Sequence, residues 1–210
     1  MTSLTPELIA ALALFAFVSS ITPGPNNTML MASGANFGFR ATAPHALGVS
    51  LGFFVLVMAV GLGLGGLFTA YPVLHDVLAV IGGGYLLWLA WKIATSTAIG
   101  AGTTGGAPQT FWQAAAFQWV NPKAWAMALG AVTAYAPADH YAVNILIVSA
   151  IFTAINLPCV SIWTGFGVGL RRFLDQPAVL RTFNVAMAIL LVASLVPLAL
   201  ELFGAAGGRR

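Results

Sequence analysis

The stretch Thr22-Pro23-Gly24-Pro25-Asn26-Asn27 interrupts an apolar segment that is long enough to cross a lipid bilayer. Two prolines and a glycine stand where a membrane helix would otherwise be continuous. Every backbone N–H and C=O in the hydrocarbon region needs a hydrogen-bond partner, so irregular backbone is tolerated there only against protein or a polar cavity. The break therefore predicts a binding site.

The composition is that of an integral membrane protein. Of the 210 residues, 60% are hydrophobic and 6% are charged, whereas about a quarter of the residues of a soluble domain are charged. The single cysteine, Cys159, excludes intramolecular disulfides and thiolate metal clusters. The basic residues are dispersed rather than clustered, which argues against nucleic acid as a partner. We expect a membrane lipid environment and no metal, cofactor or nucleic acid.

Six apolar spans fit the chain if each needs about 20 residues to cross the bilayer. They are expected at about 4–35, 44–68, 73–94, 111–135, 141–170 and 178–202. A stretch rich in Gly, Thr and Ala at about 96–110 has the composition of a linker. It separates a first repeat of about 1–95 from a second of about 111–210, within one all-α transmembrane domain.

Basic residues indicate the orientation of the six spans. One side holds five of them and the other holds two, while Lys123 falls inside a span. The five are Arg40, Lys92, Arg171, Arg172 and Arg181. Because cytoplasmic loops carry the excess of Lys and Arg, this side is expected to be cytoplasmic and both termini are expected outside.

The first break predicts a set of binding groups. Proline removes the N–H that would bond the carbonyl four residues earlier, so the two prolines release two carbonyls. Pro25 suits the first position of a new helix, whose free N–H groups and dipole attract a carboxylate. The predicted groups come from Ser19, Ile21, Pro23, Gly24, Pro25, Asn26, Asn27 and Thr28, with free N–H groups on the last three.

The fourth span contains a second proline break, at Asn121-Pro122-Lys123. Pro122 frees the carbonyl of Gln118, and Asn121 is a good N-cap for the helix that follows. Lys123 puts a cation where charge is costly and usually functional. Each half has three spans, so the second half is expected to be inverted, with two half-helix N-termini approaching one site from opposite directions.

A simpler interpretation is that each proline only kinks its helix and that Lys123 extends toward the membrane interface. Two breaks in corresponding positions, both flanked by polar side chains, favour the binding site over two independent kinks.

These motifs resemble the LysE/RhtB family of amino-acid exporters over nearly the whole chain. The resemblance lies in Thr22-Pro23-Gly24-Pro25-Asn26-Asn27, Gly38-Phe39-Arg40, Gly48-Val49-Ser50-Leu51-Gly52-Phe53, Leu86-Leu87-Trp88-Leu89-Ala90-Trp91-Lys92 and Asn121-Pro122-Lys123. The chain looks most like the branch that exports cysteine and O-acetylserine, with homoserine, threonine and leucine exporters as neighbours. The resemblance implies efflux across a bacterial inner membrane by proton antiport.

The sequence departs from family members that export lysine and arginine. Those members carry acids in the second and fourth spans, where this chain has Leu51 and Met127. This favours a neutral amino acid, whose carboxylate would meet the half-helix N-termini and Lys123 while its ammonium meets the freed carbonyls. No acid lies deep in a span, so His45 is the candidate proton carrier, with a histidine at the membrane interface as the alternative.

An enzyme is not expected. Gly48-Val49-Ser50-Leu51-Gly52 matches the nucleophile-elbow pattern, but it lies in an apolar span without the required strand. Its small residues instead predict close helix packing, and small residues on several helices also permit a homodimer. The alternative function is a membrane interaction or assembly protein that uses the transporter fold without transport.

Overall fold

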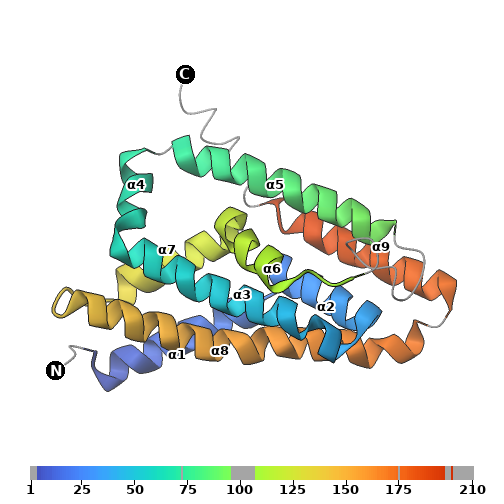
Figure 1. Ribbon diagram of the computed structural model, residues 1–210, viewed down its shortest axis with the longest axis horizontal. Coiled ribbons are helices and arrows are strands. Elements are labelled where there is room, and N and C mark those ends of the chain that lie inside the picture. Colours follow the sequence, from blue (N-terminus) through green and yellow to red (C-terminus); the bar gives the residue numbers. More distant parts are fainter. Residues whose placement is uncertain (1–3, 72, 96–106, 175, 197–199, 201–210) are drawn as a thin grey trace.

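The computed structural model describes residues 4–71, 73–95, 107–174, 176–196 and 200. Every regular element in this part of the chain is helical, as predicted (Figure 1). The elements are α1 (Pro6–Ile21), α2 (Pro25–Phe37), α3 (Phe39–Ala59), the π-helix η1 (Val60–Leu64), α4 (Gly65–Ala70), α5 (Val73–Ala94), α6 (Phe111–Phe117), the 3-10 helix η2 (Gln118–Val120), α7 (Pro122–Tyr135), α8 (Tyr141–Leu170), the 3-10 helix η3 (Arg171–Phe173) and α9 (Pro177–Ala193). Most of the predicted linker lies outside the described residues.

Two continuous helical stretches are long and apolar enough to cross a membrane, namely Phe39–Leu64 with 26 residues and Tyr141–Phe173 with 33. Helices α1 and α2 meet the same criterion together, as one span bent by 55°. Apolar helices of intermediate length cover Val80–Ala94 and Pro177–Ala193. The bounds of α5 and α8 coincide with the third and fifth predicted spans. The count of six spans remains a prediction.

The second span differs from the continuous segment predicted at about 44–68. Helix α3 begins at Phe39 and contains Pro44. Near its other end the backbone forms η1, in which Gly63 has φ +123°, a conformation that side chains with a Cβ rarely adopt. The chain therefore changes direction there, and α4 turns away from the line of α3 (Figure 1).

Glycines allow the helices to approach closely. A Cβ at Gly34 of α2 would overlap the carbonyl of Thr164 in α8, and one at Gly167 of α8 would overlap the carbonyl of Met31 in α2. Helices α3 and α6 also pack closely at a glycine, since a Cβ at Gly48 would overlap the carbonyl of Phe111. This confirms the packing role predicted for the small residues of α3.

The largest apolar core lies among α1, α3, α7 and α8. It includes Leu12, Phe53, Ala128, Val148 and Phe152, all 2% exposed or less. The rings of Phe53 and Phe152 lie 4.8 Å apart between centroids. A second cluster joins α2, α5 and α9 through residues such as Met29, Leu89 and Leu191. These two cores hold α1 and α2 on either side of the first break.

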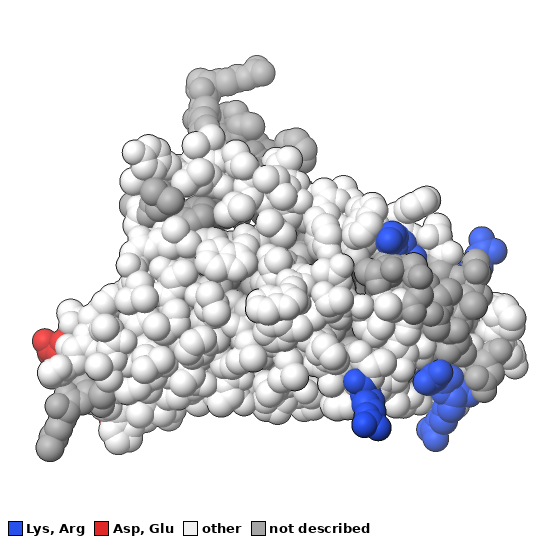
Figure 2. Space-filling view, in the orientation of Figure 1, with Lys and Arg blue, Asp and Glu red and all other residues white. Residues whose placement is uncertain are grey.

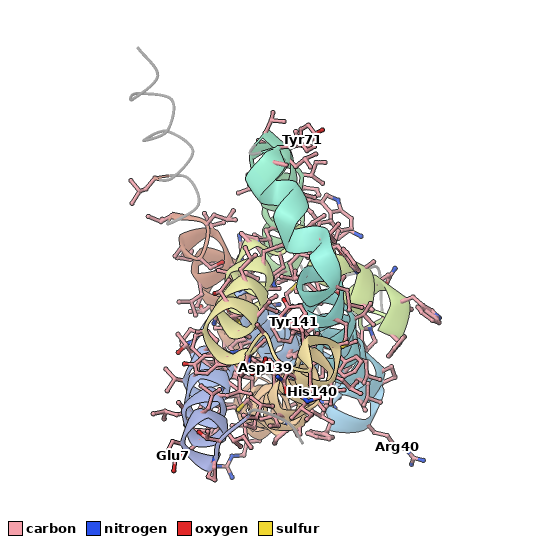
Figure 3. All side chains as sticks on the ribbon, turned by 90° about the vertical axis from the view of Figure 1, so that its left-hand side faces the viewer. Glu7, Arg40, Tyr71, Asp139, His140 and Tyr141 are labelled. Atoms are coloured by element: carbon pink, nitrogen blue, oxygen red, sulfur yellow. The ribbon has the colours of Figure 1, made fainter. Side chains whose placement is uncertain are left out.

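Most of the described basic side chains lie toward one end of the long axis. Figure 2 shows Lys and Arg gathered toward that end and an acidic side chain at the other. The basic residues belong to the start of α3, the last turn of α5, η3 and the first turns of α9, namely Arg40, Lys92, Arg171, Arg172 and Arg181. Figure 3 looks onto the opposite end, where Glu7 and Asp139 are labelled. The grouping agrees with the predicted topology, and the orientation in the membrane stays a prediction.

Candidate functional site

The first break separates α1 from α2 at Thr22-Pro23-Gly24. Pro25 occupies the first helical position of α2, as predicted. The Asn27 side chain reaches back across the break, and its Nδ2 donates to the carbonyls of Ser20 at 2.8 Å and Thr22 at 2.9 Å. A side chain at the start of α2 therefore satisfies carbonyls at the end of α1.

The second break separates α6 and η2 from α7. Asn121 is extended, with φ −89° and ψ 107°, and its Oδ1 accepts from the N–H of Lys123 at 3.2 Å. Pro122 is the first residue of α7. Both features are those predicted for a helix N-terminus that starts inside an apolar segment.

Side chains join the two breaks directly. Asn26 Nδ2 donates to Gln118 Oε1 at 2.9 Å, and Gln118 Nε2 donates to Asn26 Oδ1 at 3.2 Å. Lys123 Nζ donates to the carbonyls of Thr22 at 2.7 Å and Pro23 at 3.3 Å. Helices α2 and α7 lead away from this junction toward opposite ends of the molecule (Figure 1). Two segments about a hundred residues apart in sequence thus form one site.

The breaks enclose a small cavity with a volume of about 20 Å³, which is room for about one water molecule. Its polar lining comes mainly from the breaks and its apolar lining from α3, α7 and α8. The polar residues are Ser19, Ser20, Asn26, Asn27, Gln118, Asn121, Lys123 and Asn156, and the apolar ones are Val49, Phe53, Ala124, Met127 and Val160, with Gly24 and Pro25 completing the wall. The cavity is therefore too small, in this conformation, for a ligand much larger than water.

Eight of the predicted binding residues line this cavity and four do not. Those that line it are Ser19, Gly24, Pro25, Asn26, Asn27, Gln118, Asn121 and Lys123. Ile21, Pro23, Thr28 and Pro122 lie outside its lining. Gly24 lies directly against the Lys123 side chain, since a Cβ there would lie 2.9 Å from Cδ of Lys123.

Three backbone groups that were predicted to be free are hydrogen-bonded. The carbonyl of Ile21 accepts from Nε1 of Trp163 at 3.0 Å, because α8 packs against the end of α1. The carbonyl of Gln118 accepts from the N–H of Asn121 at 3.4 Å, because η2 tightens the turn. The N–H of Thr28 donates to the carbonyl of Gly24 at 2.9 Å, because Thr28 already lies in the second turn of α2. The prediction of free groups is therefore wrong at these positions.

His45 lies apart from the cavity lining. It is 1% exposed on α3, and neither of its ring nitrogens has a hydrogen-bond partner among the described residues. The side chain is therefore buried within the protein, and whether His45 carries protons or is a histidine at the membrane interface stays a prediction. Of the two apolar residues used to predict a neutral substrate, Met127 lines the cavity, whereas Leu51 is 45% exposed on the outer surface.

Sequence reasoning missed three polar residues beside the cavity. Ser50 Oγ donates to Asn156 Oδ1 at 2.9 Å, and Asn156 Nδ2 donates to Ser20 Oγ at 3.1 Å. The available signal was Asn156 itself, a polar residue two positions before Pro158 in an apolar span. Within the described residues no three His, Cys, Asp or Glu side chains are close enough to hold a metal ion.

Comparison with known proteins identifies the family of this chain. Residues 17–201 match the family model of the LysE type translocator, a range that includes both breaks. The cysteine/O-acetylserine efflux proteins of Escherichia coli (strain K12), Escherichia coli O9:H4 (strain HS) and Shigella sonnei (strain Ss046) are each 31% identical to this chain over 194 residues, covering 90% of this chain and 96% of the relative. The search of solved structures gives no match. The chain therefore belongs to the LysE family of translocators, and it is a transporter rather than an enzyme.

Proposed function

We propose that this translocator exports a small neutral amino acid or a close derivative, such as cysteine or O-acetylserine, from the bacterial cytoplasm. The observation that carries the proposal is the cavity between the two breaks. Its polar lining consists of hydroxyls, amides and one ammonium, with no carboxylate. A cationic amino acid would have no counter-charge there, whereas a zwitterion matches both the donors and the backbone acceptors. Relatives at 31% identity are named as cysteine/O-acetylserine efflux proteins.

Lys123 supports a specific binding mode. Its ammonium rests on the carbonyls of Thr22 and Pro23, at 2.7 and 3.3 Å, which is how a substrate ammonium would bind. When a zwitterion enters, its ammonium takes over these carbonyls and its carboxylate pairs with the displaced Lys123. The first-turn N–H groups of Asn26 and Asn27 supply further donors at a helix N-terminus. The carbonyls of Thr22 and Pro23 thus replace those of Ile21 and Gln118 as the expected site for the substrate ammonium.

The proposed architecture is six spans in two inverted three-helix repeats, with both termini outside an inner membrane. The opposite courses of α2 and α7 from one junction support it (Figure 1). Transport would then alternate access by separating the breaks on one side at a time. Proton antiport with His45 as the candidate carrier is part of the proposal. A homodimer remains a prediction, because Gly48 is used for packing within the chain.

The test is transport by the purified protein in proteoliposomes loaded with radiolabelled cysteine, O-acetylserine, homoserine, threonine, leucine or lysine. We expect efflux of at least one neutral substrate that responds to an imposed pH gradient, and none of lysine. Absence of flux for every substrate would refute the proposal and favour an interaction protein built on the transporter fold.

Lys123→Met provides the matched site variant. Loss of a charge-assisted hydrogen bond to the substrate carboxylate should lower transport at limiting substrate by about tenfold or more. Lys92→Met is the control, because Lys92 lies in the last turn of α5 and its ammonium faces the ring of Trp88 rather than the cavity. Equal transport by the two variants would contradict the role of Lys123.

A further inference from the structure

Asn156 gives the cavity a polar group that comes from neither break. It belongs to α8, is 5% exposed and lines the cavity together with Val160 of the same helix. A buried amide in an apolar helix is costly unless its hydrogen bonds are satisfied or used. The hydrogen bonds of Asn156 therefore indicate what the cavity can recognise.

Two serines fix the orientation of the Asn156 amide. Ser50 of α3 donates to its Oδ1 at 2.9 Å, and its Nδ2 donates to Oγ of Ser20, in the last turn of α1, at 3.1 Å. An amide has two N–H donors and two acceptor lone pairs. Once the two serines are bonded, one N–H and one lone pair of Asn156 remain for a ligand in the cavity.

The other residues that α3 and α8 contribute to the lining are apolar. They are Val49 and Phe53 of α3 and Val160 of α8. The proposed zwitterion places its charged head group at the breaks, where Lys123 and the backbone carbonyls lie. Its side chain then extends along the α3 and α8 side, which offers apolar contact and a single polar partner.

We propose that Asn156, held in place by Ser50 and Ser20, binds the polar group of the substrate side chain and sets the specificity of export. The site then selects amino acids with a small side chain that carries one uncharged hydrogen-bonding group, such as a hydroxyl, a thiol or an ester carbonyl. It discriminates against apolar side chains of the same size. This inference rests on the proposed function and adds the side-chain class of its substrate.

The experiment compares homoserine with norvaline, which differ by a terminal hydroxyl in place of a methyl group. Competition against a transported radiolabelled substrate in proteoliposomes gives an apparent affinity for each. The wild-type protein should prefer homoserine, because an unpaired buried amide disfavours the analogue without the hydroxyl. In Asn156→Leu, which has a similar volume, the preference should fall by about tenfold or reverse, as measured on the transport that this variant retains.

Two further variants separate recognition from folding. Ser50→Ala removes the partner that orients Asn156 without changing a lining residue, and it should reduce the same preference by a smaller factor. Ser161→Ala is the control on α8, because its hydroxyl donates to the carbonyl of Leu157 in its own helix and it does not line the cavity. It should leave the preference unchanged.

An unchanged preference in both Asn156→Leu and Ser50→Ala, with transport retained, would overturn the inference and leave the proposed function intact. If Asn156→Leu does not fold, an unchanged preference in Ser50→Ala overturns it alone. Absence of flux for every amino acid in the wild-type protein would instead refute the proposed function on which it rests.

Discussion

The reciprocal hydrogen bonds between Asn26 and Gln118 should couple the two breaks energetically. These side chains are 92 residues apart in sequence and exchange two hydrogen bonds, at 2.9 and 3.2 Å. Gln118 is fully buried and also donates to the carbonyl of Ala114, in the preceding helix α6, at 2.9 Å. The bond to Ala114 contributes to the effect of mutating Gln118 alone, but it does not contribute to the coupling.

A double-mutant cycle isolates the coupling. Hydrogen bonds between membrane helices contribute about 0.6 kcal/mol each on average, so two predict a coupling of about 1.2 kcal/mol, or about eightfold in the unfolding equilibrium constant. The variants are Asn26→Ala, Gln118→Ala and the double substitution. The measurement is the free energy of unfolding in detergent micelles by denaturant titration.

The control cycle pairs Asn26→Ala with Asn144→Ala. Asn144 lies in the first turn of α8 and donates to the carbonyls of Pro137 and Asp139, at 3.2 and 2.6 Å. Distant sites add to within about 0.5 kcal/mol. Additivity of the Asn26 and Gln118 substitutions at the level of this control would refute the conclusion that the breaks are held together by their amides.

Three further predictions follow from packing, capping and charge. Gly34→Ala should lower the free energy of unfolding by about 1–3 kcal/mol, since its Cβ would overlap the carbonyl of Thr164. The control Gly165→Ala, with nothing near its Cβ, should not destabilise the protein. Equal effects of the two substitutions in thermal unfolding would contradict the close packing of α2 against α8. Trp163→Phe removes the indole N–H that bonds the carbonyl of Ile21 and should cost about 1 kcal/mol, with native-like stability as the contrary result. A C-terminal reporter that functions only outside the cytoplasm should be active, and activity of a cytosolic reporter at that end instead would reverse the topology.

The positions of the breaks could be predicted from the sequence because proline acts locally. A missing N–H removes a hydrogen bond four residues earlier wherever the chain folds, so Pro25 and Pro122 mark helix starts in the structure as in the sequence. The cap at Asn121 is local in the same sense, since its side chain bonds the N–H two residues later. The bounds of α8 followed from a long apolar run, although Pro158 lies inside it.

The turn after α3 shows where local reasoning was insufficient. Glycines at 61, 63, 65 and 66 permitted either a packed helix or a helix end, and the sequence could not choose between them. In the structure the positive φ of Gly63 ends the line of α3, while Gly61 packs closely against Ile145. Both outcomes therefore occur in this glycine-rich stretch, close packing at Gly61 and a change of direction at Gly63.

The sequence by itself determined that this chain is an all-helical membrane protein with two interrupted helices and a polar residue set at each interruption, because proline, asparagine and hydropathy act within a few residues. Only the tertiary structure decided which of those groups are free. Trp163 donates a hydrogen bond to the carbonyl of Ile21, 142 residues away in sequence, and Lys123 donates one to the carbonyl of Thr22, 101 residues away. The tertiary structure also placed Asn156 beside the breaks. Such pairings depend on which helix faces touch, and that is set by packing across the whole chain.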